Sequence, residues 1–446
     1  MRVTQNHCTE KVEITADGDG LVSRSGTALV AGLSDRLGLT SALSEAFAGT
    51  RERAGGHDRG RVLRDLALSL ADGGDCLADL GALREQPELF GPVASAPTAW
   101  RAVAAAAEEG GLEGMRQARA AARERAWSLG GAPAQIVLDF DSHLVTAHSE
   151  KEGATPTWKR GFGFHPLLCY LDGSGEPLAG VLREGCAGAN TAADHLEVLA
   201  LALAQIPEAH LDRPMLARSD SAGATHEFAR ALAETGVRFS LGYGLTEAAR
   251  EAILALDEAA WGPAIDQDGE LREGAWVAEL TDAVDLPEWP AGTRLICRRE
   301  RPHPGAQLSF SDHEGHRFQC LITDQRGEDL AALEARHRAH AGVEDSIRCA
   351  RECGLSNLPF RDFEPNAVWL ELVLMAQDLL AHTSALCLEG ELARAEPKRL
   401  RQRILHVAGR LTRSGRRVTL HLPRRWPWAE ALLAAFGRLR SLPLLA

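Results

Sequence analysis

The sequence predicts an α/β fold whose core contains a β-rich insertion and follows an all-helical N-terminal domain. Three observations support this fold. Residues 27–127 are rich in Ala and Leu at helical spacing. Residues 130–244 alternate short apolar runs with amphipathic stretches, as in an α/β sheet. Residues 245–326 hold only short strand-like runs between loops, which indicates the insertion.

The N-terminal domain is expected over residues 1–129. In residues 61–71 (RVLRDLALSLA), apolar side chains recur on one side of a helix, and Gly73 and Gly74 follow as a stop signal. Helical bundles of this kind bind DNA in some proteins and have other roles elsewhere. The sequence therefore leaves DNA binding by this domain open.

The first part of the core is expected over residues 130–244. The apolar runs at residues 135–140, 165–171 and 177–182 are typical of buried strands. Asp172-Gly173 is a turn signal between the second and third runs, so the three strands should form an antiparallel meander. Helices and strands alternate after them.

The core should resume over residues 327–390, after the insertion at 245–326. It is expected to contain a long helical stretch at residues 331–353 and a helix at 366–386 that is apolar nearly all round and therefore buried. Residues 391–446 are expected to form a basic tail. They carry thirteen Lys/Arg against three Glu, whereas the whole chain has a net charge of −13. This asymmetry fits an end that faces a polyanion, and a merely solvated basic tail is the alternative.

Acidic residues end two of the predicted strands. Asp139 and Asp141 lie on one face of the first strand, because side chains alternate along a strand. Two carboxylates leaving a buried strand together are costly unless they are paired or bind metal, although one of them capping a turn through Ser142 is the alternative. Asp220 ends a short strand, where open α/β sheets place site residues, and a helix N-cap is the alternative there.

A third acid lies on the predicted helix at residues 331–353. His337, His340 and Glu344 are spaced i, i+3 and i+7, and Arg351 lies seven residues further on. One helical face thus combines an acid, which can bind a divalent cation, with basic groups, which can bind phosphate. A solvent-exposed charged face is the alternative interpretation.

This spacing resembles the Y-x2-R-x3-E-x6-K signature of DDE transposases from insertion sequences, most closely the IS-four superfamily in its IS-thirteen-eighty branch. His337 takes the place of the Tyr, His340 of the Arg, Glu344 of the Glu and Arg351 of the Lys. Blocks around the other two acids resemble the same group. The matching blocks are residues 138–168, 182–195 and 217–223.

The resemblance implies an RNase H-like catalytic core in which Asp141, Asp220 and Glu344 are catalytic metal ligands, with Asp139 as the alternative first ligand. Two Mg²⁺ ions about 4 Å apart would neutralise charge on the attacking and leaving oxygens, with Mn²⁺ as a substitute. The implied reaction is DNA cleavage at terminal inverted repeats followed by strand transfer into target DNA.

The implied partners are double-stranded DNA, as transposon ends and as target, and a second copy of the chain in a homodimer on DNA. No membrane partner is expected, because the sequence has no uncharged apolar run of about 20 residues. The polar N-terminus indicates a cytoplasmic protein, which in a bacterium would lie at the nucleoid when bound to DNA.

Several side chains are candidates for DNA contact. Basic groups near the acids would hold phosphates without reading sequence. Trp158 or Trp276 would stack on a flipped base, although a core tryptophan is the commoner case. The candidate phosphate contacts are Lys159, Arg160, Arg338, His340 and Arg351.

Three alternatives compete with an active transposase. A zinc site at His337, His340, Cys349 and Cys353 is disfavoured, because one helix cannot easily wrap four ligands around an ion. A catalytically inactive, transposase-derived DNA-binding protein fits the substituted signature and the acidic bulk charge. A repair nuclease on the same fold is the third. The nine scattered cysteines indicate reduced thiols rather than a disulfide framework.

Overall fold

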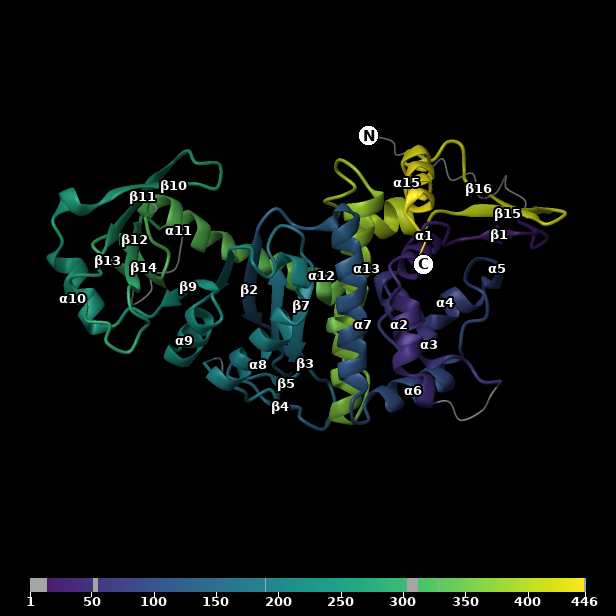
Figure 1. Cartoon of the computed structure of the whole chain (residues 1–446), viewed down its shortest axis with the longest axis horizontal. Coiled ribbons are helices and arrows are strands. Elements are labelled where there is room, and N and C mark those ends of the chain that lie inside the picture. The colour runs from purple at the N-terminus through teal and green to yellow at the C-terminus, as the bar shows by residue number, and fades with distance from the viewer. Residues whose placement is uncertain (1–13, 51–54, 189, 303–311, 328, 445–446) are drawn as a thin grey trace, which may run out of the picture.

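Figure 1 shows the computed structural model, which describes residues 14–50, 55–188, 190–302, 312–327 and 329–444. The polar segment before residue 14 lies outside these residues. The strands of the main sheet are β2 (Ile136–Ser142), β6 (Leu167–Leu171), β7 (Pro177–Val181), β8 (Met215–Ser219), β9 (Arg238–Tyr243), β10 (Gly262–Ile265), β11 (Leu271–Glu279), β12 (Arg294–Glu300), β13 (Asp312–His313) and β14 (His316–Thr323). Within the described residues they form one mixed ten-stranded sheet of order β10-β11-β12-β14-β9-β8-β2-β6-β7, with β13 paired to β14.

Helices surround this sheet and fill the N-terminal end of the molecule. The α-helices are α1 (Thr27–Arg36), α2 (Leu39–Ala46), α3 (Arg59–Ala71), α4 (Gly81–Arg84), α5 (Pro87–Phe90), α6 (Ala96–Ala106), α7 (Gly111–Ala126), α8 (Ala192–Leu203), α9 (His226–Glu234), α10 (Glu247–Ala255), α11 (Leu330–Arg338), α12 (Val343–Ala350), α13 (Phe363–Cys387), α14 (Pro397–Leu400) and α15 (Ala429–Ser441). The short 3-10 and π-helical turns are η2 (Ala48–Thr50), η3 (Leu77–Leu80), η4 (Trp127–Gly131), η5 (Glu208–His210), η6 (Glu258–Ala260), η7 (Ala339–Gly342), η8 (Arg351–Leu355) and η9 (Arg401–Leu405).

The predicted meander is present. Strands β2 and β6 pair antiparallel, as do β6 and β7, and the turn between the last two contains Gly173 at φ 78°. Strands β8 and β9 then run parallel to β2. A small separate sheet, β3 (Val145–Thr146), β5 (Phe162–Phe164) and β4 (Thr155–Pro156), lies in the loop between β2 and β6.

The described part of residues 245–326, which were expected as a β-rich insertion, continues the sheet of β2, β8 and β9. Strand β14 pairs antiparallel with β9, from Cys320 opposite Tyr243 to Thr323 opposite Ser240. Strands β12, β11 and β10 follow outward, and α11 packs on β10 and β11. The insertion and the strands that carry two of the predicted acids therefore belong to one sheet.

The helical stretch expected at residues 331–353 is interrupted. It is divided into α11, the 3-10 turn η7 and α12, and η7 ends at Gly342, a residue type with low helix propensity. His337, His340 and Glu344 still line one cleft, as their spacing predicted, whereas Arg351 does not line it.

Helix α13 is the buried helix predicted at residues 366–386. Among the described residues it is the one helix long and apolar enough to cross a membrane, yet most of it is buried inside this protein. Its Glu371 and Asp378 are also buried. The helix is thus a core element, and its two carboxylates require partners inside the protein.

Two arginines of α7 supply those partners. Arg119 contacts Glu371 at 2.5 Å and Asp378 at 2.7 Å, and Arg123 contacts Asp378 at 2.5 Å and Glu176 at 3.1 Å. Burial alone would raise the pKa of Glu176, but hydrogen bonding and charge from His382, together with Arg123, lower it to about 2. This network joins α7, α13 and the start of β7.

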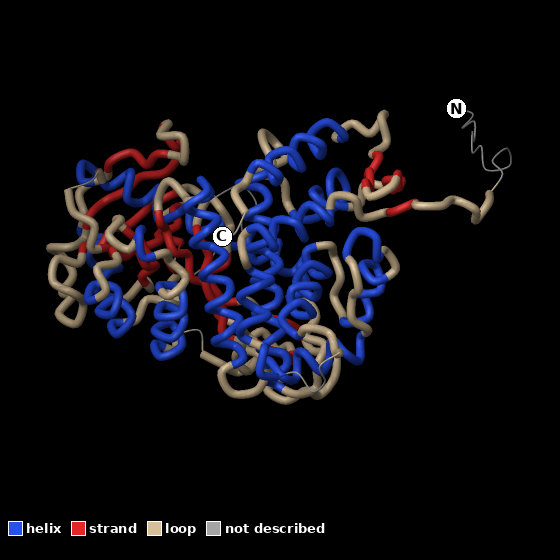
Figure 2. Tube along the Cα trace, turned by 45° about the vertical axis from the view of Figure 1, so that its right-hand side comes forward, coloured by secondary structure: helices blue, strands red, loops and turns tan. Residues whose placement is uncertain are grey.

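The two ends of the chain meet in a second sheet. Strand β1 (Leu21–Val22) pairs with β15 (Gly409–Ser414), which pairs with β16 (Arg417–His421). In Figures 1 and 2 this sheet lies apart from the main sheet, across the N-terminal helices. Among the described residues before 130, β1 is the one strand and the other regular elements are helical. The residues expected as a basic tail are instead folded, because α15 buries an apolar side against α1 and α13.

The buried network gives a stability prediction. Arg123→Ala leaves Glu176 and Asp378 buried without this partner, so the free energy of unfolding should fall by about 3–5 kcal/mol. Chemical denaturation would measure the change. Gln117→Ala, at an exposed position of the same helix, should change stability by less than about 0.5 kcal/mol. Equal effects of the two substitutions would contradict the role of the network.

Candidate active site

The parallel pairing of β2 and β8 brings two predicted acids together. Asp139 lies opposite Arg218, and Phe140 lies opposite Ser219. The residue after Phe140 is Asp141, and the residue after Ser219 is Asp220. Because parallel strands end at the same edge of a sheet, both side chains emerge side by side at the carboxyl edge.

Both carboxylate oxygens of Asp139 have hydrogen-bond partners inside the protein, below that edge. Both of its oxygens accept hydrogen bonds from Arg218, at 2.8 Å from Nε and 2.6 Å from Nη2, and His340 Nδ1 lies 2.9 Å from Oδ1. Arg218 also contacts Asp172 at 2.8 Å. Asp139 and Arg218 are both buried. The pair joins two residues that face each other in the β2–β8 register, so it holds that register in place.

Asp141, Asp220 and Glu344 line one open cleft of about 640 Å³. Asp141 accepts a hydrogen bond from the backbone N–H of Ser142 at 2.7 Å, and Asp220 accepts one from Ala222 at 2.9 Å. Within the described part of the chain, no cationic side chain forms an ion pair with any of the three carboxylates. The cleft therefore gathers negative charge that the protein does not neutralise.

The ionisation of Asp141 reflects this arrangement. Burial raises its pKa most, the negative charges of Asp220 and Glu344 raise it further, and the Ser142 N–H and His340 partly oppose them. The resulting pKa is about 6. Three carboxylates close enough to repel one another, and made only of oxygen donors, fit a divalent cation such as Mg²⁺.

A glycine on β9 makes room for Asp220. A Cβ atom on Gly242 would lie 2.6 Å from the backbone nitrogen of Ser221 and 2.9 Å from the carbonyl carbon of Asp220. Both neighbours are backbone atoms, which cannot rotate away. Strand β9 therefore requires glycine at this position so that the turn carrying Asp220 can reach the cleft.

Comparison with known families identifies the type of protein. The family model of the group 1 transposase DDE domain matches residues 4–444, nearly the whole chain. The chain belongs to this family. It is thus a transposase of the DDE type, a class of enzymes that uses divalent metal ions. No curated protein sequence matches it. Among solved structures, the piggyBac transposase synaptic complex with hairpin DNA is similar, with a TM-score of 0.44, 10% identity, and coverage of 84% of this chain and 78% of that chain.

The two histidines of the transposase signature have structural partners. His337 is half-buried, with Nδ1 3.0 Å from the Ser240 hydroxyl, and desolvation together with the charge of His340 lowers its pKa. His340 is buried against Asp139 and lines the cleft. The zinc set proposed from sequence does not form, since His337, His340, Cys349 and Cys353 make no metal-type group among the described residues.

The predicted phosphate contacts of the transposase lie in two places. Arg338 lines the cleft with His340 and is held by Glu334 at 3.2 Å. Lys159, Arg160 and Arg351 are exposed and do not line the cleft.

Lys159 and Arg351 nevertheless lie near the end of β2. Burial lowers the pKa of His143, two residues after Asp141, and the positive charges of Arg351, His165 and Lys159 lower it further. His143 was not predicted from sequence. Neither was Arg298, which lines the cleft from β12 and bonds Glu334 at 2.5 Å. The alternation of side chains along a strand could not distinguish Arg298, which lines the cleft, from an ordinary surface arginine.

The two candidate tryptophans differ in environment. Trp158 is 68% exposed and has Lys159 Nζ 4.8 Å from its ring centre. Trp276 is half-buried between Arg299 and Arg301, at 4.9 and 5.4 Å. Neither lines the cleft.

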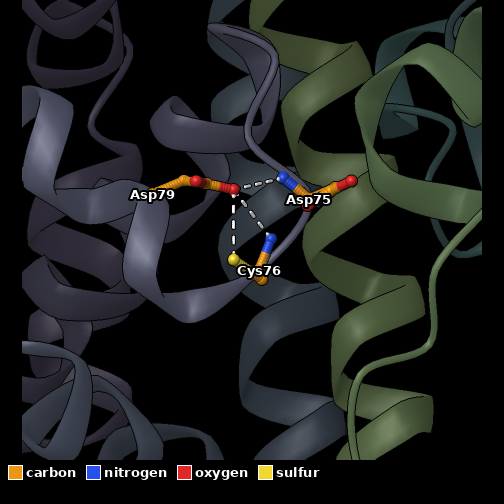
Figure 3. A group of neighbouring side chains, drawn as sticks. All are labelled: Asp75, Cys76 and Asp79. Carbon is orange, nitrogen blue, oxygen red and sulfur yellow. Dashed lines mark hydrogen bonds between the residues drawn. The ribbon is translucent and has the colours of Figure 1, made fainter.

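Two other groups of metal-ligating residue types have structural explanations. In Figure 3, one oxygen of Asp79 accepts hydrogen bonds from the N–H groups of Asp75 and Cys76, at 2.8 and 3.0 Å, and from the Cys76 thiol at 3.3 Å. These bonds cap η3. The second group, Glu176, Asp378 and His382, belongs to the buried network that the arginines of α7 neutralise.

The raised pKa of Asp141 predicts a pH-dependent stability difference. The folded state holds the Asp141 proton more tightly than the unfolded state does. The resulting stabilisation is fully present below the unfolded pKa of about 3.9 and is lost as the pH rises through about 6. Without metal, Asp141→Asn should therefore gain about 1–3 kcal/mol of stability over wild type above pH 6. That gain should vanish below about pH 4.

Denaturation in EDTA at several pH values would measure it. Asp345→Asn, at an exposed position next to Glu344, controls for the loss of a surface charge. If the stability gained by Asp141→Asn did not change with pH, the raised pKa of Asp141 would not be its cause.

Proposed function

We propose that this transposase cuts double-stranded DNA at the terminal inverted repeats of its element and joins the freed ends to target DNA. The observation that carries the proposal is the cleft in which three unpaired carboxylates, Asp141, Asp220 and Glu344, lie together. They come from two parallel strand ends and one helix that are far apart in sequence. Such convergence of unneutralised acids is unstable unless it binds cations.

We propose that strands β7-β6-β2-β8-β9, with α8, α9 and α12, are an RNase H-like core. An antiparallel meander followed by two strands parallel to the first supports this assignment. The acids then lie at the carboxyl edge of its two central strands and on the helix that follows the insertion.

The three carboxylates would hold the divalent cations, and their oxygen-only donor set favours Mg²⁺, with Mn²⁺ as a substitute. When bound, two such ions would neutralise charge on the attacking and leaving oxygens of the phosphodiester. Asp139 is not proposed as a ligand, because both of its oxygens are occupied by Arg218 and His340.

The basic residues would position the DNA. Arg338 and His340 line the cleft and would contact the phosphates next to the reacting bond. Lys159, Arg160 and Arg351 would hold the backbone further along, beside the end of β2. Each chain has one such cleft in its described residues, so we propose a homodimer that holds the two transposon ends.

Cleavage assays test the proposal. With supercoiled DNA that carries the cognate ends and Mg²⁺, the substitutions Asp141→Asn, Asp220→Asn and Glu344→Gln should each lower the cleavage rate at least about 10³-fold, or about 4 kcal/mol. Affinity for the ends in the absence of metal should change little. Asp345→Asn is the matched control and should cleave like wild type.

Two outcomes would count against the proposal. Normal cleavage by all three variants would show that these three carboxylates do not catalyse the reaction. A wild-type chain that binds ends but never nicks them, with Mg²⁺ or Mn²⁺, would favour the inactive DNA-binding protein.

Metal-dependent stabilisation separates the roles of Asp139 and Asp141. Ligand binding to the folded state raises the unfolding temperature, so Mg²⁺ or Mn²⁺ should stabilise wild type. Asp141→Asn should abolish that shift. Asp139→Asn should keep the shift but lose about 3 kcal/mol of stability without metal, because Arg218 loses its partner. The reverse pattern would make Asp139 the ligand.

A further inference from the structure

The C-terminal region concentrates positive charge. Residues 397–429 contain ten Lys/Arg and no Asp or Glu, in a chain whose net charge is −13. Six of these arginines lie on the β15–β16 hairpin or in the turn after it, and all six side chains are exposed. They are Arg410, Arg413, Arg416, Arg417, Arg424 and Arg425. We call this set the hairpin arginines.

The hairpin presents one polar face. Its register places Arg410 opposite His421 and Ser414 opposite Arg417, and side chains alternate between faces along each strand. Arg410, Arg417 and His421 therefore share a face and are exposed, whereas Leu411 and Leu420 occupy the other face and are half-buried. The face without apolar side chains is the one open to a polar partner.

Arg413 lies opposite Val418 on the face of Leu411 and Leu420. Tight turns hold the other three arginines in place. Gly415 has φ 59° and forms, with Arg416, the two-residue tip between Ser414 and Arg417. Arg424 and Arg425 lie in a turn closed by a hydrogen bond of 3.0 Å from the N–H of Trp426 to the carbonyl of Pro423. The Trp426 indole anchors this turn through a bond of 2.9 Å to the Arg403 carbonyl. The backbone that carries these charges is thus fixed by hydrogen bonds.

The hairpin arginines are uncompensated. Over the described part of the chain, none of them forms an ion pair or a side-chain hydrogen bond. The nearby acids Asp17 and Asp19, just before β1, form no ion pair with them either. Some arginines elsewhere do pair at the surface: Arg348, for example, contacts Asp345 and Glu396, each at 2.9 Å. Like charges gathered without partners repel one another, and a polyanion relieves that repulsion.

We propose that the hairpin arginines bind the phosphate backbone of double-stranded DNA at a surface separate from the catalytic cleft. The inference rests on the proposed function, because it takes DNA as the substrate. In Figure 1 the hairpin lies at the end of the molecule opposite β10–β14, and N-terminal helices lie between it and the main sheet. The DNA held there is consequently not the reacting phosphodiester but a more distant stretch of the same duplex. Such contacts position the duplex without reading its sequence.

The salt dependence of DNA binding tests the proposal. Each phosphate neutralised by a cationic side chain contributes about 0.9 to the slope of log affinity against log salt concentration. The probe is a mixed-sequence duplex of about 40 bp, without divalent metal, between about 50 and 200 mM KCl. A triple variant, Arg410→Gln, Arg416→Gln and Arg417→Gln, should lose about 2–3 from that slope and bind at least about tenfold more weakly.

Two further variants serve as controls. Arg101→Gln, Arg230→Gln and Arg250→Gln together make the same change in net charge at exposed positions away from the hairpin, and should keep the wild-type slope. Replacing the three hairpin positions by lysine retains the charge and should also keep it. This second result excludes misfolding as the cause of weaker binding.

Each outcome has one interpretation. A wild-type chain that does not bind the duplex contradicts both the proposed function and this surface. A wild-type chain that binds, together with a hairpin variant of unchanged slope, overturns this surface alone. Equal losses in the hairpin and control variants would also overturn it, because bulk charge would then explain the effect.

Discussion

The buried ion pair between Asp139 and Arg218 is the interaction on which the site depends. It joins opposite residues of two parallel strands, so it is satisfied in one register only. A slip of one residue would separate the pair and turn Asp141 and Asp220 to different faces of the sheet. His340 bonds the same carboxylate, so the Asp139 side chain also fixes the position of the segment that leads to Glu344. One polar contact thus aligns all three elements that supply the acids.

The sequence predicted the central strands and the family because their signals are local. Strands β2, β6 and β7 are short apolar runs, and the transposase signature is a spacing along one segment. It could not show which of Asp139 and Asp141 is free, because that depends on Arg218, whose pairing with Asp139 arises only when β2 and β8 align. The joining of β14 to β9 was equally hidden, since it is set by contacts between residues about 80 positions apart.

Local features were also misjudged where tertiary packing outweighs helical spacing. The spacing placed Arg351 on the face of His337, His340 and Glu344, but Arg351 begins the π-helical turn η8 and does not line the cleft that the other three share. The basic C-terminus was expected as a tail from its charge. Its apolar residues, such as Leu432 and Leu439 of α15, recur at helical spacing and are buried, and this pattern identifies a folded segment.

The continuity of the main sheet has a mechanical consequence. Strands β9 and β14 share backbone hydrogen bonds, so the insertion that lines the cleft with Arg298 and the strands that carry the aspartates are parts of one stiff plate. Such a plate cannot hinge at their junction without breaking that ladder. The position of Arg298 relative to the two aspartates is therefore set by the backbone of the sheet. The proposed DNA substrate would then meet a cleft whose floor keeps one shape.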